Sequence, residues 1–133
     1  MATVLLEIPP RSVYVGVVRL AVASLARSAG LDEETVYDLK IAVSEACANA
    51  VLGLEASESE DPISITLSDE GTSLELEVAD RGPTWSTEPD IEDSQGFDTR
   101  STMSLALLQS LVDECRISPR EGGGTVTRLT IAR

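Results

Sequence analysis

The 133-residue sequence contains no histidine and a single lysine, Lys40. Histidine is the commonest general base and metal ligand near neutral pH, so its absence excludes His-Asp triads and phosphohistidine chemistry within this chain. The lysine is not part of a Gly-Lys-Ser/Thr sequence, which excludes a Walker-type phosphate-binding loop. Chemistry in this chain must therefore rely on carboxylates, amides, hydroxyl groups, arginine and the backbone.

Aromatic residues and cysteines are also scarce, with four of the former and two of the latter. Apolar residues still make up 42% of the chain, so the core must consist of Val, Ile, Leu and Ala. Cys47 and Cys115 lie in apolar periodic stretches and are expected to be reduced core thiols. No apolar run approaches the roughly 18 residues of a membrane span, and the N-terminus lacks the features of a signal peptide. We therefore expect one cytoplasmic domain over residues 1–133.

Negative charge is concentrated in the middle of the sequence. The net charge is −13, and residues 55–98 alone carry fourteen Asp or Glu side chains against one arginine. Such an acidic surface repels the phosphates of nucleic acids and favours a basic protein partner. The plainer alternative is a solvated surface that keeps the protein soluble.

Hydrophobic periodicity predicts the order strand, helix, helix, hairpin, long loop, helix, hairpin. Ser12 and Asp32 are expected to be the N-caps of the first two helices. Residues 85–100 are expected to form a long flexible loop, and loops of this length are often functional. The expected strands lie at 3–8, 62–68, 73–78, 115–118 and 125–131, and the expected helices at 12–30, 32–54 and 102–112. The pattern predicts a two-layer α+β sandwich.

Glu45 and Asn49 lie four residues apart on the second expected helix, so their side chains are neighbours on one face. An asparagine amide oxygen is a good ligand for Mg²⁺, and a carboxylate one turn away can orient or deprotonate a nucleophile. The alternative is an ordinary polar border of an amphipathic helix, which is the commoner case for such a pair alone.

Two glycine-containing turns can each be interpreted either as a ligand-binding segment or as an ordinary turn. Asp80 follows an expected strand, and its carboxylate can accept a hydrogen bond from an exocyclic amine such as adenine N6. Gly82 allows a sharp turn and the close approach of a ligand. Thr125 follows three glycines and can contact a ligand from a strand start, while Arg100 can approach phosphates from the long loop. The alternatives are ordinary turns and a surface arginine.

Together these pieces resemble the GHKL, or Bergerat-fold, ATPases, and most closely the anti-sigma-factor serine kinases. The run 38–51 contains Glu45-Ala46 and Asn49-Ala50 and is similar to the N-box of those kinases, Glu-Ala-x-x-Asn-Ala. The Asp80-x-Gly82 step resembles their G1 box. Residues 104–114 resemble the helix after their lid, and residues 123–126 resemble their closing Gly-Gly-Thr strand. The resemblance covers nearly the whole chain in the family's order.

The resemblance implies a Bergerat fold, in which three helices cover one face of a mixed, mostly antiparallel sheet and ATP with Mg²⁺ lies between helices, sheet and lid. It implies that Glu45 is the catalytic base, that Asn49 is the ligand of ATP-bound Mg²⁺ and that Asp80 accepts the adenine amine. The other nucleotide-binding positions that we expect are Gly82 at the adenine turn, Thr125 as a second adenine-side contact, and Arg100 and Ser104 near the lid.

The same resemblance implies a protein serine kinase that uses ATP and Mg²⁺ to phosphorylate a small anti-anti-sigma protein. It also implies that the chain holds a sigma factor inactive, as a homodimer without direct contact to nucleic acid or membrane. One departure is that Thr102 and Ser104 stand where the family usually has Gly-x-Gly. If both positions need positive φ, replacing each glycine by a residue with a side chain costs about 1–2 kcal/mol. Together the two replacements would then lower nucleotide affinity by roughly a hundredfold. The alternative is a catalytically weak or inactive module of the same fold that regulates a partner by docking alone.

Overall fold

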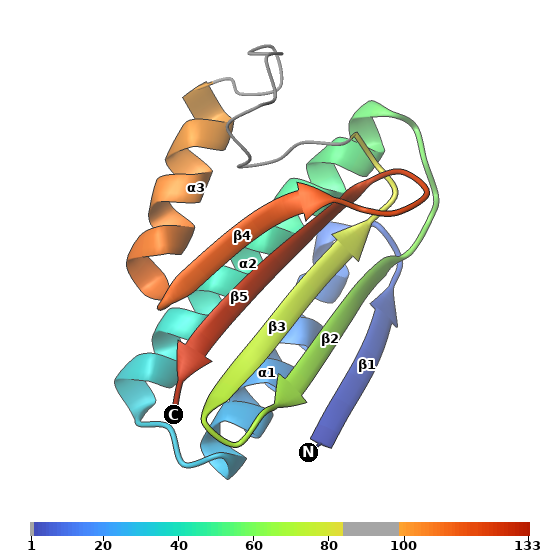
Figure 1. Cartoon of the computed structure of the whole chain (residues 1–133). Coiled ribbons are helices and arrows are strands. Elements are labelled where there is room, and N and C mark those ends of the chain that lie inside the picture. The colour runs from blue at the N-terminus through green and yellow to red at the C-terminus, as the bar shows by residue number, and fades with distance from the viewer. Residues whose placement is uncertain (1, 84–98) are drawn as a thin grey trace.

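Figure 1 shows the computed structural model of the chain, which describes residues 2–83 and 99–133. Three helices lie on one face of a five-stranded sheet, which confirms the predicted two-layer α+β architecture (Figure 1). A short 3-10 turn, η1 (Ser12–Tyr14), precedes the first α-helix. The remaining elements are β1 (Ala2–Ile8), α1 (Val15–Ser28), α2 (Glu33–Ala56), β2 (Ile63–Asp69), β3 (Ser73–Asp80), α3 (Thr99–Leu111), β4 (Glu114–Pro119) and β5 (Thr125–Ala132).

The strand order in the sheet is β1-β2-β3-β5-β4, and each pairing among the described strands is antiparallel. Both predicted hairpins are present, as β2–β3 and β4–β5. The chain crosses through α3 between them, and β5 returns to pair with β3 in the centre. This return places Asp80 opposite Thr125, so two residues far apart in sequence meet at one end of the sheet.

The core lies between the sheet and the helices. Residues in β2 and β3 alternate between buried and half-buried, because successive side chains of a strand point to opposite faces. Leu39 and Leu54 of α2 and Ile63 of β2 are completely buried. Both cysteines are free, and burial raises the pKa of the Cys47 thiol to about 12 and that of Cys115 to about 11. They are therefore protonated near neutral pH, as expected for core thiols.

The two predicted N-caps have different outcomes. Asp32 caps α2, because its Oδ1 accepts a hydrogen bond from the Thr35 amide at 2.8 Å. The Thr35 side chain and then this amide lower the pKa of Asp32. The prediction for Ser12 is wrong. Arg11 is the extended residue before η1, so Ser12 already lies inside the turn, and α1 begins only at Val15 without a side-chain cap.

The predicted loop at 85–100 is only partly tested, since residues 84–98 lie outside the described residues. Arg100 was predicted to end this loop, and that prediction is wrong. Arg100 belongs to the first turn of α3, which begins at Thr99. The first turn of α3 is polar and therefore lacks the apolar periodicity that marks the rest of the helix. No helix within 2–83 and 99–133 is long and apolar enough to cross a membrane.

Candidate functional site

Asp80 and Thr125 form a buried polar pair at one end of the sheet. They face each other across β3 and β5, with 7% and 1% of their surfaces exposed. The Gly82 amide donates to Asp80 Oδ1 at 2.7 Å, and Thr125 Oγ1 donates to the Pro83 carbonyl oxygen at 2.7 Å. These two hydrogen bonds hold the segment that follows β3 against the strand ends.

The electrostatics of Asp80 are dominated by its burial, which raises the pKa of the carboxyl group. The Gly82 amide and the positive charge of Arg120 act in the opposite direction. An ionised carboxylate can accept several hydrogen bonds through its two oxygens. The Gly82 amide donates to one of these oxygens, Oδ1. A carboxylate can accept a hydrogen bond from a neutral amine, such as the exocyclic amine of adenine.

Two glycines permit the close packing around Asp80. A Cβ at Gly124, where φ is +108°, would lie 1.9 Å from the Asp80 carbonyl oxygen. A Cβ at Gly82 would lie 3.1 Å from Asp80 Oδ1 and 3.4 Å from the carbonyl carbon of Gly53 on α2. Gly82 therefore lets the turn approach both the carboxylate and the helix.

Asn49 lies on α2 one turn before Gly53, so the two residues share a side of the helix. Asn49 Nδ2 donates to Ser104 Oγ of α3 at 2.6 Å. A Cβ at Gly53 would lie 3.2 Å from Pro83 Cδ, so the same side of α2 also meets the segment after β3. The structure thus brings Asn49, Ser104 and the Asp80 end of the sheet to one side of α2.

Thr102 and Ser104 do not have the positive φ that would strain their backbone. Both residues are helical within α3, and Glu58, with φ of 52°, is the one non-glycine residue with positive φ among those described. Replacing the two glycines of the family pattern therefore carries no conformational penalty in this structure. It instead adds side chains to α3, and the Ser104 hydroxyl reaches Asn49.

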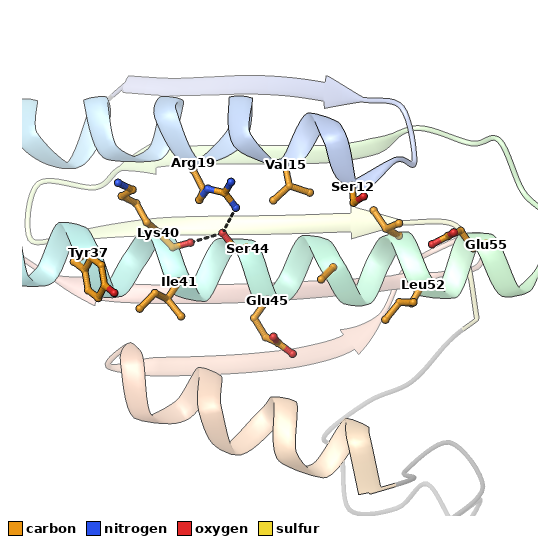
Figure 2. Close-up of a pocket in the computed structure, with 12 residues that line it drawn as sticks. Ser12, Val15, Arg19, Tyr37, Lys40, Ile41, Ser44, Glu45, Leu52 and Glu55 are labelled. Carbon is orange, nitrogen blue, oxygen red and sulfur yellow. Dashed lines mark hydrogen bonds between the residues drawn. The ribbon is translucent and has the colours of Figure 1, made fainter.

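Glu45 is half-buried and lines a hollow of about 760 Å³ over the outer surface of α1 and α2 (Figure 2). Ser44 faces Arg19 of α1, while Glu45 projects from the other side of α2 (Figure 2). The residues that line the hollow do not include Asn49, Asp80, Gly82 or Thr125. Glu45 is therefore one turn from Asn49 along the helix, but it lines the hollow at the molecular surface whereas Asn49 does not.

Sequence patterns singled out Glu45 but not Arg19 or Ser44, two other polar residues that line this hollow. Arg19 Nη1 donates to Ser44 Oγ at 3.0 Å, and Ser44 Oγ donates to the Lys40 carbonyl oxygen at 2.7 Å. The one available signal was that Arg19 interrupts the apolar pattern of its helix. The predicted phosphate contact of Arg100 stays untested, because its side chain lies outside the described part of the structure.

The side chains near Asn49 determine whether a divalent cation such as Mg²⁺ can be bound there. Within residues 2–83 and 99–133, no group of three or more Cys, Asp or Glu side chains could hold a metal ion by itself. Mg²⁺ at nucleotide sites commonly takes one or two protein oxygens and fills its shell with phosphates and water. The amide oxygen of Asn49 fits that arrangement, in which the nucleotide supplies most of the ligands.

The family model described as a histidine kinase-like ATPase domain matches residues 8–131, and the chain belongs to this family. Its relatives include the serine-protein kinase RsbW of Bacillus pumilus, which is 33% identical over 88% of this chain and 78% of that protein. The serine-protein kinase RsbW of Halalkalibacterium halodurans is 31% identical over 96% of this chain and 82% of that protein. The resemblance inferred from the motifs is confirmed.

A solved structure supports the fold. The structure of the RsbU and RsbW domains of Rv1364c from Mycobacterium tuberculosis superimposes with a TM-score of 0.74 at 23% sequence identity. The match covers 99% of this chain and 32% of that chain. The match therefore spans about a third of that solved chain, and at this identity the likeness concerns the fold alone.

Proposed function

We propose that this chain is an ATP-dependent protein serine kinase of the anti-sigma type. It phosphorylates a serine of a small anti-anti-sigma protein, holds a sigma factor inactive in the cytoplasm, and uses residues 1–133 as one ATP-binding unit. The supporting observation is the convergence of Asn49, Asp80 and Thr125 on one side of α2, around the Gly82 turn. The names of the relatives, serine-protein kinases, support the reaction class.

In this proposal each residue of the buried end has a separate task. Asp80 accepts the adenine amine, Gly82 leaves room for the base, and Thr125 holds the Pro83 segment in place. Asn49 offers its amide oxygen to the cation. Bound ATP with Mg²⁺ supplies the phosphoryl group and neutralises its charge, and catalysis by the protein is then mostly positioning.

Glu45 is the proposed general base, which accepts the proton of the substrate serine. Glu45 is one of the residues that line an open hollow on the outer surface of α2, and we propose that a protein substrate approaches from this surface. The same helix carries Asn49 one turn further on, toward the proposed phosphate side. Arg100 and Ser104 are proposed to lie on that side as well, since both belong to the beginning of α3.

Nucleotide binding is the first test. We expect the wild-type protein to bind Mg·ADP in a calorimetric titration. We expect Asn49→Ala and Asp80→Asn each to weaken binding by about tenfold or more, because each removes a hydrogen bond or ligand to a charged group. Ser110→Ala, on the exposed side of α3, is the matched control. No detectable binding at millimolar nucleotide would contradict the proposal.

Phosphoryl transfer is the second test. Glu45→Ala should lower phosphorylation of an anti-anti-sigma protein by about a hundredfold or more, the usual size of general-base catalysis. Its affinity for Mg·ADP should remain close to that of the wild type, since Glu45 lines the hollow rather than the buried end. Glu55→Ala is a control from the same hollow. Unchanged transfer in Glu45→Ala would remove Glu45 from this role.

A second candidate function is a docking module of the same fold that regulates its partner without catalysis. It is favoured by Thr102 and Ser104, which occupy the positions where the family usually has the glycines of the lid end. The nucleotide titration separates the two functions.

We also propose that two copies associate through the outer side of α1. Val13, Val17 and Leu20 recur at helical spacing and are 76%, 53% and 73% exposed. Residues 1–30 carry three arginines and one glutamate, a net charge of +2 in a chain of −13. Two copies that meet there avoid the repulsion between their acidic surfaces.

A further inference from the structure

The amide of Asn49 has two ends of nearly the same shape, one with oxygen and one with NH₂. Only the oxygen can bind Mg²⁺, because the NH₂ group is a hydrogen-bond donor. The terminal torsion of asparagine is broad and roughly two-fold, so the side chain alone does not choose between the two orientations. A neighbouring acceptor that holds the NH₂ end decides which end a cation meets.

Ser104 is such a neighbour. Asn49 Nδ2 donates to Ser104 Oγ at 2.6 Å between α2 and α3, so the bond engages the end of the amide that cannot bind a cation. Ser104 is 3% exposed, so water has little access to compete for this hydrogen bond.

The position of the Ser104 hydroxyl is determined by the packing of α3. Leu108 follows Ser104 by one turn, and both are buried on the same face of α3; Val112, directly after the helix, is buried as well. The backbone of Ser104 is helical and unstrained. The hydroxyl is therefore held by the core, as a residue that orients another side chain must be.

We propose that Ser104 is a positioning residue whose hydroxyl holds the Asn49 amide with its oxygen directed to the Mg²⁺ of a bound nucleotide. This inference rests on the proposed nucleotide-binding function and adds to it a role for the Ser104 hydroxyl, which a glycine at this position would lack. Partners of metal ligands commonly contribute about ten- to hundredfold to metal affinity. Ser104 should therefore influence how strongly Mg²⁺ increases nucleotide affinity.

The contact can be tested without nucleotide. Asn49 is the single asparagine of the chain, so protein carrying ¹⁵N in its asparagine side chain gives one pair of side-chain amide NMR signals. We expect Ser104→Ala to shift this pair clearly. Ser110→Ala should leave it in place, because the Ser110 hydroxyl donates to the Leu107 carbonyl oxygen. Signals that do not move in Ser104→Ala would overturn the inference.

The positioning role is tested by titrating ADP with Mg²⁺ present and again with EDTA. In the wild type, Mg²⁺ should strengthen ADP binding. In Ser104→Ala this strengthening should fall by about tenfold or more, so that affinity falls much further with Mg²⁺ than in EDTA. Ser104→Cys has nearly the same volume but accepts hydrogen bonds weakly, so it should give the same result if Ser104→Ala folds poorly.

The possible failures are distinguishable. If the wild type binds ADP in neither buffer, the proposed function fails and this inference fails with it. If the wild type responds to Mg²⁺ and Ser104→Ala responds equally, the positioning role alone is wrong. An equal loss of affinity in both buffers would show general damage to the site and would also overturn that role.

Discussion

Single residues at the end of the sheet owe their properties to burial. Asp80 is the one charged side chain that is buried in the described part of the chain, with 7% of its surface exposed. Moving an ionised carboxylate away from water costs free energy, and this cost raises the pKa of Asp80. The Gly82 amide and Arg120 offset part of that cost without removing it. Asp80 is thus retained at some expense of stability, as is common for groups that serve binding.

The raised pKa of Asp80 predicts how the effect of replacing Asp80 on the free energy of unfolding depends on pH. Because the folded-state pKa lies above the ordinary value of 3.8, the folded protein binds this proton more tightly. The contribution of Asp80 to the free energy of unfolding is therefore complete below pH 3.8 and is lost as the pH rises through the raised pKa. Asp80→Asn does not titrate and keeps an acceptor for Gly82.

We therefore expect Asp80→Asn to gain stability relative to the wild type as the pH rises from 3 to 7, although it loses nucleotide affinity. Urea unfolding at several pH values measures this difference. A stability difference between the two proteins that is constant across this pH range would contradict the assigned pKa direction.

Among the elements, the β4–β5 hairpin determines how closely the last strand approaches Asp80. Gly122, Gly123 and Gly124 all have positive φ, a conformation that side chains disfavour. A Cβ at Gly123 would have nothing within 4 Å, whereas a Cβ at Gly124 would lie 1.9 Å from the Asp80 carbonyl oxygen. The two glycines therefore have the same backbone requirement but different packing requirements.

This difference makes the two glycines a matched pair for mutation. Gly123→Ala should lower the free energy of unfolding by about 1–2 kcal/mol through its backbone conformation alone. Gly124→Ala should lower it by about 4 kcal/mol or more, because β5 must also move away from β3. Chemical denaturation of both variants measures the difference, and equal costs would show that the close approach at Gly124 is not needed.

At the scale of the whole molecule, charge and apolar surface are distributed unevenly. The acidic residues concentrate in 55–98, whereas 1–30 has a net charge of +2 and a row of exposed apolar side chains on η1 and α1. Exposed apolar groups of this kind commonly mark sites of protein association. This distribution supports the proposed contact between two copies.

The proposed association predicts a change of mass on mutation. Leu20→Glu places a charge in the apolar row and should convert a dimer into a monomer in light scattering at micromolar concentration. Leu107→Glu is the matched control, since Leu107 is also exposed, at 39%, but lies on α3. A wild-type protein that is monomeric, or a Leu20→Glu variant that remains dimeric, would contradict this interface.

Much of the fold was predictable because it depends on local patterns. The alternation in β2 and β3, both hairpins and the Asp32 cap follow from residues that are neighbours in sequence. The motif residues Asn49, Asp80 and Thr125 were also recognisable as types and spacings. Local reasoning failed at Ser12, because the extended Arg11 places it inside a 3-10 turn. It also failed at the start of α3, whose polar first turn has no periodic signal.

The sequence by itself determined the two-layer α+β class, the reliance on carboxylate, amide and hydroxyl chemistry, and the family. Only the tertiary structure decided that Asp80 is paired with Thr125, that Gly124 packs on the Asp80 backbone and that Ser104 holds Asn49. The physical reason is that periodicity and capping act between residues a few positions apart. These three contacts instead join segments that meet only when the helices pack on the sheet and β5 enters its centre.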